Sequence, residues 1–247
     1  MNCNRLKVTL LKNDKLVNIL APLCLHLESV SPTVHIVKAT PDMYDKVGLL
    51  EEEQQIHKAV KKRQREFRAG RQSAREAIKR LVSNDSELAQ VAILLGKARE
   101  PLFPSLISGS ISHTDSLCLA ACALKSEVPS LGIDVENNTP LASHLFSSIY
   151  TQSEKALMET SNTLPDALIF SIKESLFKCL YPFVQVYFDF LDAQITLQPD
   201  AENAGQFHFE LIGENRTLLL ANLPNLSFHG HYCFTEQYVF SLCFFSS

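Results

Sequence analysis

Apolar residues recur along the chain at two different spacings, which predicts a protein of mixed helices and strands. Ile169, Ile172, Leu176 and Leu180 repeat at helical spacing, so we expect a helix with one buried stripe around them. Beyond this helix, apolar and polar positions alternate, which indicates several antiparallel strands. The segments concerned are 185–197, 207–212, 217–220, 226–232 and 238–244.

The segment before these elements contains strong helix formers from residue 51 to about residue 82. It is acidic at its start and basic later, which suits the dipole of one long helix or of a broken pair. Gly70 is the expected break. Residues 1–45 are expected to hold short strands and loops, including strands near 7–11 and 33–37, and residues 140–168 to be helical with loops.

Two apolar runs in the middle of the chain are expected to be neighbouring strands. Residues 117–124 form an uninterrupted apolar run that is typical of a buried strand, and residues 131–136 favour a second strand. The connection between them contains Pro129. We therefore predict an antiparallel hairpin with a loop longer than the tightest types.

Composition limits the possible classes of protein. The chain has 247 residues, 46% of them hydrophobic and 20% charged, as in an ordinary soluble globular protein. Seven cysteines occur without a Cys-x-x-Cys pair or zinc-finger spacing, which favours reduced thiols. There is no signal-peptide pattern and no apolar run of membrane-spanning length, so a cytoplasmic protein without a membrane span is predicted.

Asp134 and Glu136 lie two residues apart in a β-favouring segment. Their carboxylates should therefore point to one side of a strand, with Ile133 and Val135 on the other. Two acids on one strand face suit a hard divalent cation. A half-solvated strand face is the alternative explanation.

The predicted helix that follows carries a second set of charged residues. Glu174 and Lys178 are four apart and share a face, either as part of a site or as a common exposed pair. Lys173 falls near the edge of the apolar stripe, where its stem either reaches toward solvent or serves a specific task.

Basic side chains upstream are candidates for binding phosphate. Arg68, Arg71 and Arg75 are spaced by three and four residues on one helix face, and guanidinium groups match phosphate geometry. Lys97 and Arg99 lie in a proline-containing loop, and Arg63, Ser112 and His113 add further donors. The alternatives are a solvated basic face and a structural histidine.

Taken in order, these segments resemble the phosphopantetheinyl transferases, specifically the enterobactin-synthetase-type branch. The resemblance runs from about Lys61 to the end of the chain and rests on an ordered set of motifs. They are Gly70-Arg71 with Arg75, Lys97 and Arg99 with Pro101 and Pro104, Gly109 to His113, Gly132 to Glu136, and Lys173-Glu174-Ser175 with Lys178. Phe170 stands where the family usually has a tryptophan.

The resemblance implies transfer of the phosphopantetheine arm of coenzyme A to a serine of an acyl or peptidyl carrier protein. It implies that Asp134, Glu136 and Glu174 bind Mg²⁺, with Glu174 also the candidate general base. Lys178 would contact the phosphate and help the leaving group, and Lys173 would support this catalytic set. The resemblance implies that coenzyme A is bound by the basic and polar residues Arg63, Arg71, Arg75, Lys97, Arg99, Ser112 and His113.

The resemblance also implies an α+β fold of two similar, pseudo-symmetric α/β halves. The expected halves are residues 1–125 and 126–247, with the active site between them, in a chain that acts as a monomer. The carriers expected are those of siderophore, nonribosomal-peptide, polyketide or fatty-acid assembly.

Two alternative functions remain open from the sequence. One is a non-catalytic module that binds coenzyme A or a carrier protein. The other is nucleic-acid binding through the basic segment Lys58 to Arg80, which the net charge of −4 makes unfavourable.

Overall fold

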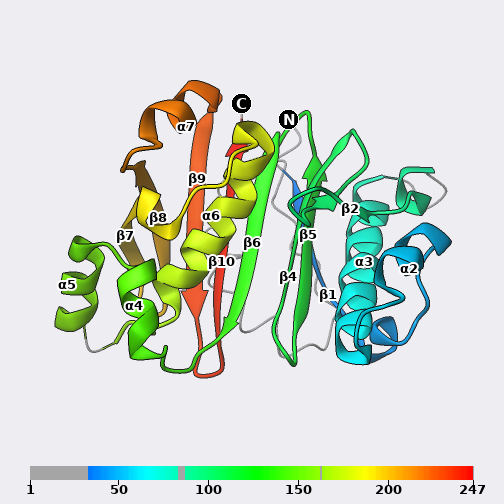
Figure 1. Ribbon diagram of the computed structural model, residues 1–247, viewed down its shortest axis with the longest axis horizontal. Coiled ribbons are helices and arrows are strands. Elements are labelled where there is room, and N and C mark those ends of the chain that lie inside the picture. Colours follow the sequence, from blue (N-terminus) through cyan, green and yellow to red (C-terminus); the bar gives the residue numbers. More distant parts are fainter. Residues whose placement is uncertain (1–32, 83–86, 162, 247) are drawn as a thin grey trace.

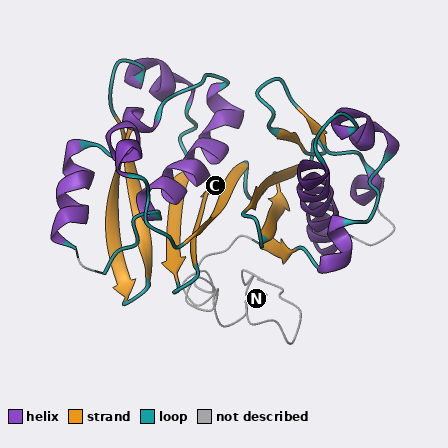
Figure 2. Ribbon diagram, turned by 60° about the horizontal axis from the view of Figure 1, so that its bottom comes forward, coloured by secondary structure: helices purple, strands orange, loops and turns teal. Residues whose placement is uncertain are grey.

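The computed structural model describes residues 33–82, 87–161 and 163–246. It shows an α+β protein with two sheet-containing halves side by side, each with helices packed on its sheet (Figures 1 and 2). This confirms the predicted fold class. The predicted strand near residues 7–11 lies outside the described residues.

The first half has a three-stranded antiparallel sheet in the order β1-β5-β4. Its strands are β1 (Val34–Lys38), β4 (Ile107–His113) and β5 (Cys118–Leu124). Helix α3 (Lys61–Leu81) packs on this sheet, and α2 (Leu50–Ile56) packs beside α3 (Figure 1). Between α3 and β4, β2 (Leu94–Leu95) and β3 (Pro101–Leu102) form a small hairpin. Short 3-10 helices lie at Pro41–Tyr44 and Glu87–Gln90.

The second half has a five-stranded antiparallel sheet in the order β6-β10-β9-β8-β7. Helix α6 (Leu168–Val184) packs on it, mainly against β6 and β10. The strands are β6 (Ser130–Asn137), β7 (Ala193–Ala201), β8 (Ala204–Leu211), β9 (Ser227–Phe234) and β10 (Tyr238–Ser246), and the smaller helices are α4 (Ser143–Ile149), α5 (Gln152–Thr160), α7 (Arg216–Asn222) and a 3-10 turn, Phe190–Asp192.

The two halves share one topological plan. In the first half, a strand (β1) is followed by a long helix (α3) and a hairpin (β4, β5), and the last strand pairs antiparallel with the first. In the second half, β6, α6 and the pair β9–β10 repeat that order, and β10 pairs antiparallel with β6. The repeated plan agrees with the predicted similarity of the halves.

The apolar stripe of α6 is buried against the second sheet, as the spacing predicts. Ile169, Ile172, Leu176 and Leu180 are all fully buried. Close approach is possible because Gly132 of β6 lies directly under the helix. A Cβ atom at Gly132 would fall 1.9 Å from the backbone oxygen of Ser175. The glycine therefore sets how near α6 comes to the strand that carries Asp134.

The break predicted at Gly70 is wrong. The helical segment is indeed a broken pair, but the break lies between α2 and α3, at residues 57–60. Gly70 is buried inside α3, where an added Cβ would lie 2.8 Å from the Ile111 side chain. Its small size serves the packing of α3 on β4.

Two strand predictions are also wrong. Strand β5 pairs with β1 and β4, whereas β6 pairs with β10, so the expected hairpin of residues 117–136 does not form. Residues 217–220 lie in α7, with Leu219 buried and Leu218 and Leu220 half exposed. In 185–197 the strand begins only at Ala193. The helices at 140–168 and the strands near 33–37, 207–212, 226–232 and 238–244 are confirmed.

Among the described residues, no helix combines the length and apolar character needed to cross a membrane.

Candidate functional site

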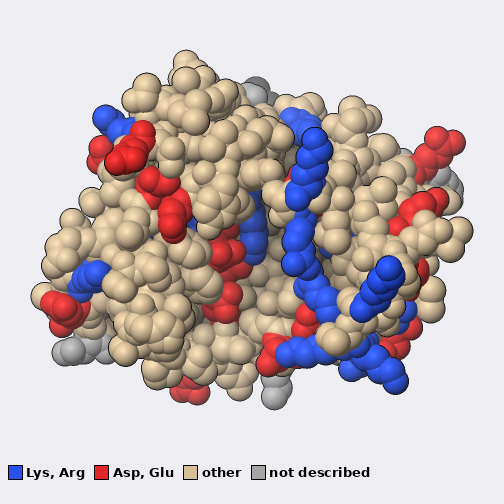
Figure 3. All heavy atoms as spheres, viewed as in Figure 1, with Lys and Arg blue, Asp and Glu red and all other residues tan. Residues whose placement is uncertain are grey.

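A hollow lies between the two halves, bordered by charges of opposite sign. In the space-filling view, acidic side chains line one side of this central depression and a row of lysines and arginines lines the other (Figure 3). A cavity of about 270 Å³ opens here between the β2–β3 turn, β4 and α6. Arg99, Ser110, Glu174 and Lys178 are among its lining residues.

Asp134 is the most buried acid of the site, with 2% of its surface exposed. Its Oδ1 accepts hydrogen bonds from Lys178 Nζ at 2.6 Å and Ser112 Oγ at 2.8 Å. Its Oδ2 is buried and has no hydrogen-bond partner. Because buried carboxylate oxygens are normally satisfied, this atom is open to a hydrogen-bond donor or a cation.

Glu136 and Glu174 complete a group of three carboxylates. Burial, reinforced by the charges of Asp134 and Glu174, raises the pKa of Glu136 to about 7, although Lys178 opposes the shift. Burial and Asp134 likewise raise the pKa of Glu174, again against Lys178. The acids therefore repel one another, and an added positive charge between them would be stabilised.

Lys178 is the cation that lies beside these acids in the structure. Its Nζ also donates to the backbone oxygen of Ile133 at 3.3 Å and lies 4.0 Å from Glu174 Oε2. Burial disfavours the ammonium, but Asp134 and Glu174 outweigh it and raise the pKa of Lys178. Among the described residues, no three acidic, histidine or cysteine side chains already converge as a complete metal site.

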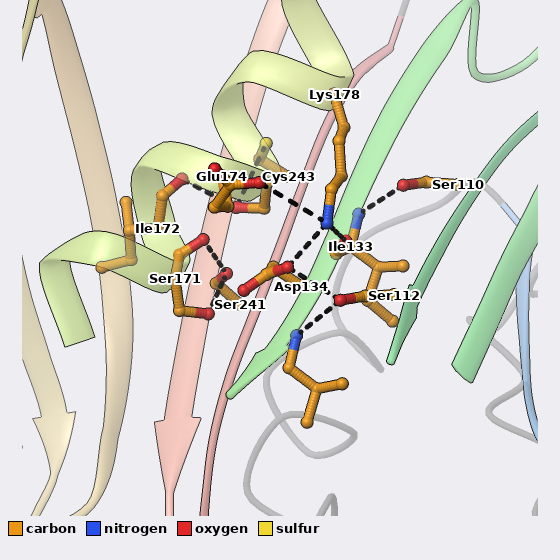
Figure 4. Close-up of polar contacts among 12 residues, drawn as sticks. Ser110, Ser112, Ile133, Asp134, Ser171, Ile172, Glu174, Lys178, Ser241 and Cys243 are labelled. Atoms are coloured by element: carbon orange, nitrogen blue, oxygen red, sulfur yellow. Dashed lines mark hydrogen bonds and ion pairs between the residues drawn. The ribbon is translucent and has the colours of Figure 1, made fainter. Parts of the chain in front are cut away.

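Ser112, which the family resemblance assigns to coenzyme A binding, contacts β6 in the structure. Its hydroxyl donates to Asp134 and accepts from the backbone N–H of Val135 at 3.2 Å. Ser110, two residues earlier on β4, accepts from the N–H of Ile133 at 3.1 Å. Figure 4 shows both serines pointing from β4 toward β6, and Glu174 and Lys178 coming from α6 on the other side.

The basic residues of α3 differ in their surroundings. Arg63 Nη1 donates to His113 Nε2 at 2.8 Å, which requires a neutral imidazole. Burial, together with the charges of Arg63 and Lys178, lowers the pKa of His113, against an opposing effect of Glu66. These two side chains lie side by side at the end of β4, near enough to Lys178 for its charge to act on His113.

Arg71 is buried in the first half, where burial lowers its pKa to about 10, so it stays charged at neutral pH. Its guanidinium lies 3.9 Å from the ring centre of Phe67, and its Nε donates to the backbone oxygen of Ile93. Its Nη2 is buried without a hydrogen-bond partner. A buried charge with one open donor group suits an anion.

Arg75 instead pairs with Glu52, Nη1 to Oε1 at 2.6 Å, in a nearly buried contact. The same oxygen accepts from the N–H of Ile93. This placement gives Arg75 a structural task, joining α3 to α2 and to the start of β2. Its assignment to coenzyme A remains a prediction without a supporting contact.

The basic segment does not present a continuous unpaired face. Six of its ten lysines and arginines pair with acidic side chains within the chain: Lys62–Asp115, Arg63–Glu66, Arg65–Asp45, Arg68–Glu53, Arg75–Glu52 and Arg80–Glu76. This removes the main sequence argument for nucleic-acid binding.

Lys97 and Arg99 lie in the turn between β2 and β3. Arg99 adopts a left-handed backbone conformation with φ of 67° and lines the cavity together with Glu174 and Lys178. The turn therefore brings a cation from the first half opposite α6 of the second half. Lys97 is exposed two residues earlier.

Lys173 does not contact the three carboxylates of the site. Its Nζ donates to Glu154 Oε2 at 2.7 Å, to the backbone oxygen of Ile149 at 2.8 Å and to that of Phe190 at 2.9 Å. These three acceptors use all three ammonium hydrogens. The contacts favour a structural role, joining α6 to α4, α5 and the 3-10 turn.

Sequence reasoning missed Ser110, Glu52, Glu154 and the packing role of Gly132. The alternation Ser108, Ser110, Ser112 along β4 was a usable signal, because side chains two apart share a strand face. The partners of Glu52 and Glu154 lie 23 and 19 residues away, so no local spacing reveals them.

Two family models match this chain, one over most of each half. The family model described as the 4'-phosphopantetheinyl transferase N-terminal domain matches residues 51–123, and that of the 4'-phosphopantetheinyl transferase superfamily matches residues 130–243. The second match contains the three carboxylates and Lys178, and the first contains the arginines of α3.

Several curated proteins are similar over most of their length. 4'-Phosphopantetheinyl transferase Npt of Nocardia iowensis is 30% identical over 76% of this chain and 85% of its own. 4'-Phosphopantetheinyl transferase Svp of Streptomyces mobaraensis is 36% identical over 71% of each chain. Enterobactin synthase component D of Escherichia coli (strain K12) is 27% identical over 85% of this chain and 92% of its own. The chain therefore belongs to the 4'-phosphopantetheinyl transferase superfamily and is an enzyme of that family.

Proposed function

We propose that this enzyme transfers the phosphopantetheine arm of coenzyme A, in an Mg²⁺-dependent reaction, to a serine hydroxyl of an acyl or peptidyl carrier protein. One observation carries the metal dependence. The buried Oδ2 of Asp134 has no hydrogen-bond partner, although the charge of Asp134 contributes to the raised pKa of both Glu136 and Glu174.

Asp134, Glu136 and Glu174 fit a divalent cation because all three offer carboxylate oxygens, the ligands that Mg²⁺ prefers. When bound, the ion would neutralise the negative charge of the coenzyme A pyrophosphate. In the structure, the ammonium of Lys178 contacts Asp134 and lies near Glu174. With a cation bound to these acids, Lys178 would be free to contact a phosphate of coenzyme A.

Glu174 is the proposed general base. Its carboxylate is only partly exposed, and burial raises its pKa, which brings it closer to the range in which a carboxylate accepts a proton efficiently. It takes the proton of the carrier serine as the serine oxygen bonds to phosphorus and the pyrophosphate P–O bond breaks. Lys178 stabilises the negative charge that develops on the departing phosphate.

The first half is proposed to hold the nucleotide end of coenzyme A. Arg71 offers a buried guanidinium with an open Nη2, Arg63 and His113 are hydrogen-bonded to each other, and Arg99 lines the cavity. Lys97 adds an exposed cation at the same turn. Arg75 and Ser112 would act through Glu52 and Asp134.

The proposed partners are carrier domains of siderophore, nonribosomal-peptide, polyketide or fatty-acid assembly. We also propose a monomer in the cytoplasm, where the thiols of the five described cysteines, all buried, would stay reduced. Light scattering coupled to size-exclusion chromatography tests the oligomeric state.

Mass spectrometry of an apo carrier protein incubated with the enzyme, coenzyme A and Mg²⁺ tests the reaction. We expect a gain of one phosphopantetheine on the carrier serine that a chelator abolishes. Asp134→Ala and Glu174→Gln should both abolish the gain, with circular dichroism showing that they fold. Transfer that persists in chelator would refute the metal requirement, and coenzyme A binding without transfer across several carriers would indicate a non-catalytic module.

A further inference from the structure

Strands β4 and β6 face each other across the junction between the halves, yet they belong to different sheets. β4 is an edge strand of the three-stranded sheet, and β6 is an edge strand of the five-stranded sheet. The described residues place no backbone ladder between them, so the amide groups of β6 that face β4 need other partners.

Three serines of β4 bridge this junction: two accept from amide groups of β6, and the third contacts the connection that precedes β6. Ser108, Ser110 and Ser112 alternate along the strand and are all buried. Ser108 donates to the backbone oxygen of Val128 at 2.6 Å, and Ser110 and Ser112 accept from the N–H groups of Ile133 and Val135. We call this set of contacts the serine seam.

The seam holds the strand on both sides of Asp134. The two amides that it fixes belong to the residues immediately before and after this aspartate. Ser112 also donates to Asp134 Oδ1, so one hydroxyl fixes both the backbone and the carboxylate (Figure 4). Since Oδ1 is held by Ser112 and Lys178, Oδ2 is the oxygen that remains open.

We propose that Ser112, assisted by Ser110, is a positioning residue of the transfer reaction. It orients Asp134 so that one carboxylate oxygen stays available to a divalent cation. This inference rests on the proposed function and gives Ser112 a role different from the phosphate contact expected from the sequence.

Lys178 alone is a poor substitute for the hydroxyl. Its ammonium sits at the end of a flexible four-carbon stem, and it also approaches Ile133 and Glu174. Without Ser112, the carboxylate can rotate and present either oxygen to the lysine, and the N–H of Val135 is left without its acceptor. Both effects weaken cation binding at Asp134.

The test compares Ser112→Ala with Ser108→Ala in the full chain. Ser108 is a matched control because it is buried to the same extent, 5% exposed against 6% for Ser112. Its seam contact is with Val128, in the connection before β6 and away from the acids. Affinity for Mn²⁺, measured by electron paramagnetic resonance without substrate, reports on the site independently of turnover. Asp134→Ala shows which part of the Mn²⁺ binding belongs to this site, because that part should be lost in the variant.

We expect Ser112→Ala to weaken Mn²⁺ binding about tenfold, the loss of one hydrogen bond to a charged group. Ser110→Ala should have a smaller effect, and Ser108→Ala should leave the affinity unchanged while lowering the melting temperature. Wild-type affinity in Ser112→Ala, or equal losses in Ser112→Ala and Ser108→Ala, would overturn the inference. If wild-type enzyme transfers phosphopantetheine in that case, only the role of the seam fails. Absence of transfer by the wild type would instead refute the proposed function.

Discussion

Replacement of Lys173 by methionine separates a structural from a catalytic role for this residue. Lys173 and Glu154 form an ion pair in which both side chains are 1% exposed, and the lysine makes two further bonds to backbone oxygens. Methionine retains most of the apolar stem and removes the charge. We therefore expect a loss of stability with little direct effect on the chemical step.

The expected loss of stability depends on Glu154, the charge that stays buried without its partner. Removing one partner of a buried ion pair typically costs about 3–5 kcal/mol, because the other charge stays buried. Glu154 keeps hydrogen bonds from the backbone N–H groups of Thr151 and Ile195, which favours the lower end, about 3 kcal/mol. For a chain of this size, that corresponds to a fall in melting temperature of about 6–12 °C.

Urea unfolding at pH 7 measures the loss of stability, and transfer to an apo carrier well below the melting temperature measures kcat. The double variant Lys173→Met/Glu154→Gln is the control, since it removes the charge left by the single substitution and should regain part of the stability. A Lys173→Met protein of wild-type stability whose kcat falls a hundredfold would refute the reasoning and restore the catalytic assignment.

Three further predictions concern the site and its supports. Because the pKa of Glu136 is raised from 4.5 to about 7, its ionisation destabilises the fold, so in chelator the free energy of unfolding should fall as pH rises through this interval. The expected fall in the free energy of unfolding is on the order of 2 kcal/mol after allowance for partial exposure. It should vanish in Glu136→Gln, and a variant whose pH profile equals that of the wild type would contradict the prediction. Gly132→Ala, which forces a methyl group into the backbone of α6, should lower the melting temperature and the transfer rate together, and normal behaviour in both assays would show that the helix can move away. Arg71→Ala should raise the KM for coenzyme A with kcat retained, whereas a selective loss of kcat would assign Arg71 to the chemical step.

Much of the fold was predictable because periodicity reports which face of an element is buried. The stripe around Ile172 matches the observed burial, and Ile133 and Val135 pack in one hydrophobic core, although Asp134 between them is equally buried. The predicted pairing of residues 117–124 with 131–136 failed because strand order depends on long-range contacts. Strand β10, about a hundred residues later, takes the place beside β6.

The other errors arose from local rules that tertiary packing overrides. Gly70 is a weak helix former, yet in α3 its small size allows contact with Ile111, which its neighbours in sequence do not reveal. Residues 217–220 are a short apolar run, which periodicity alone cannot assign to helix or strand.

Within the candidate site, the carboxylates Asp134, Glu136 and Glu174 could be predicted to share a location only through the ordered family motifs. The contacts of Lys173 and Ser112 required the structure. Each depends on a partner from a separate element, Glu154 for the lysine and β6 for the serine.

The facing of β4 and β6 also bears on how the protein avoids self-association. An uncovered edge strand is a template for pairing with other chains, and here each half covers an edge of the other. Separating residues 51–123 from 130–243 would expose both edges at once. The two segments matched by the family models are therefore expected to aggregate when produced apart and to stay dispersed when produced together.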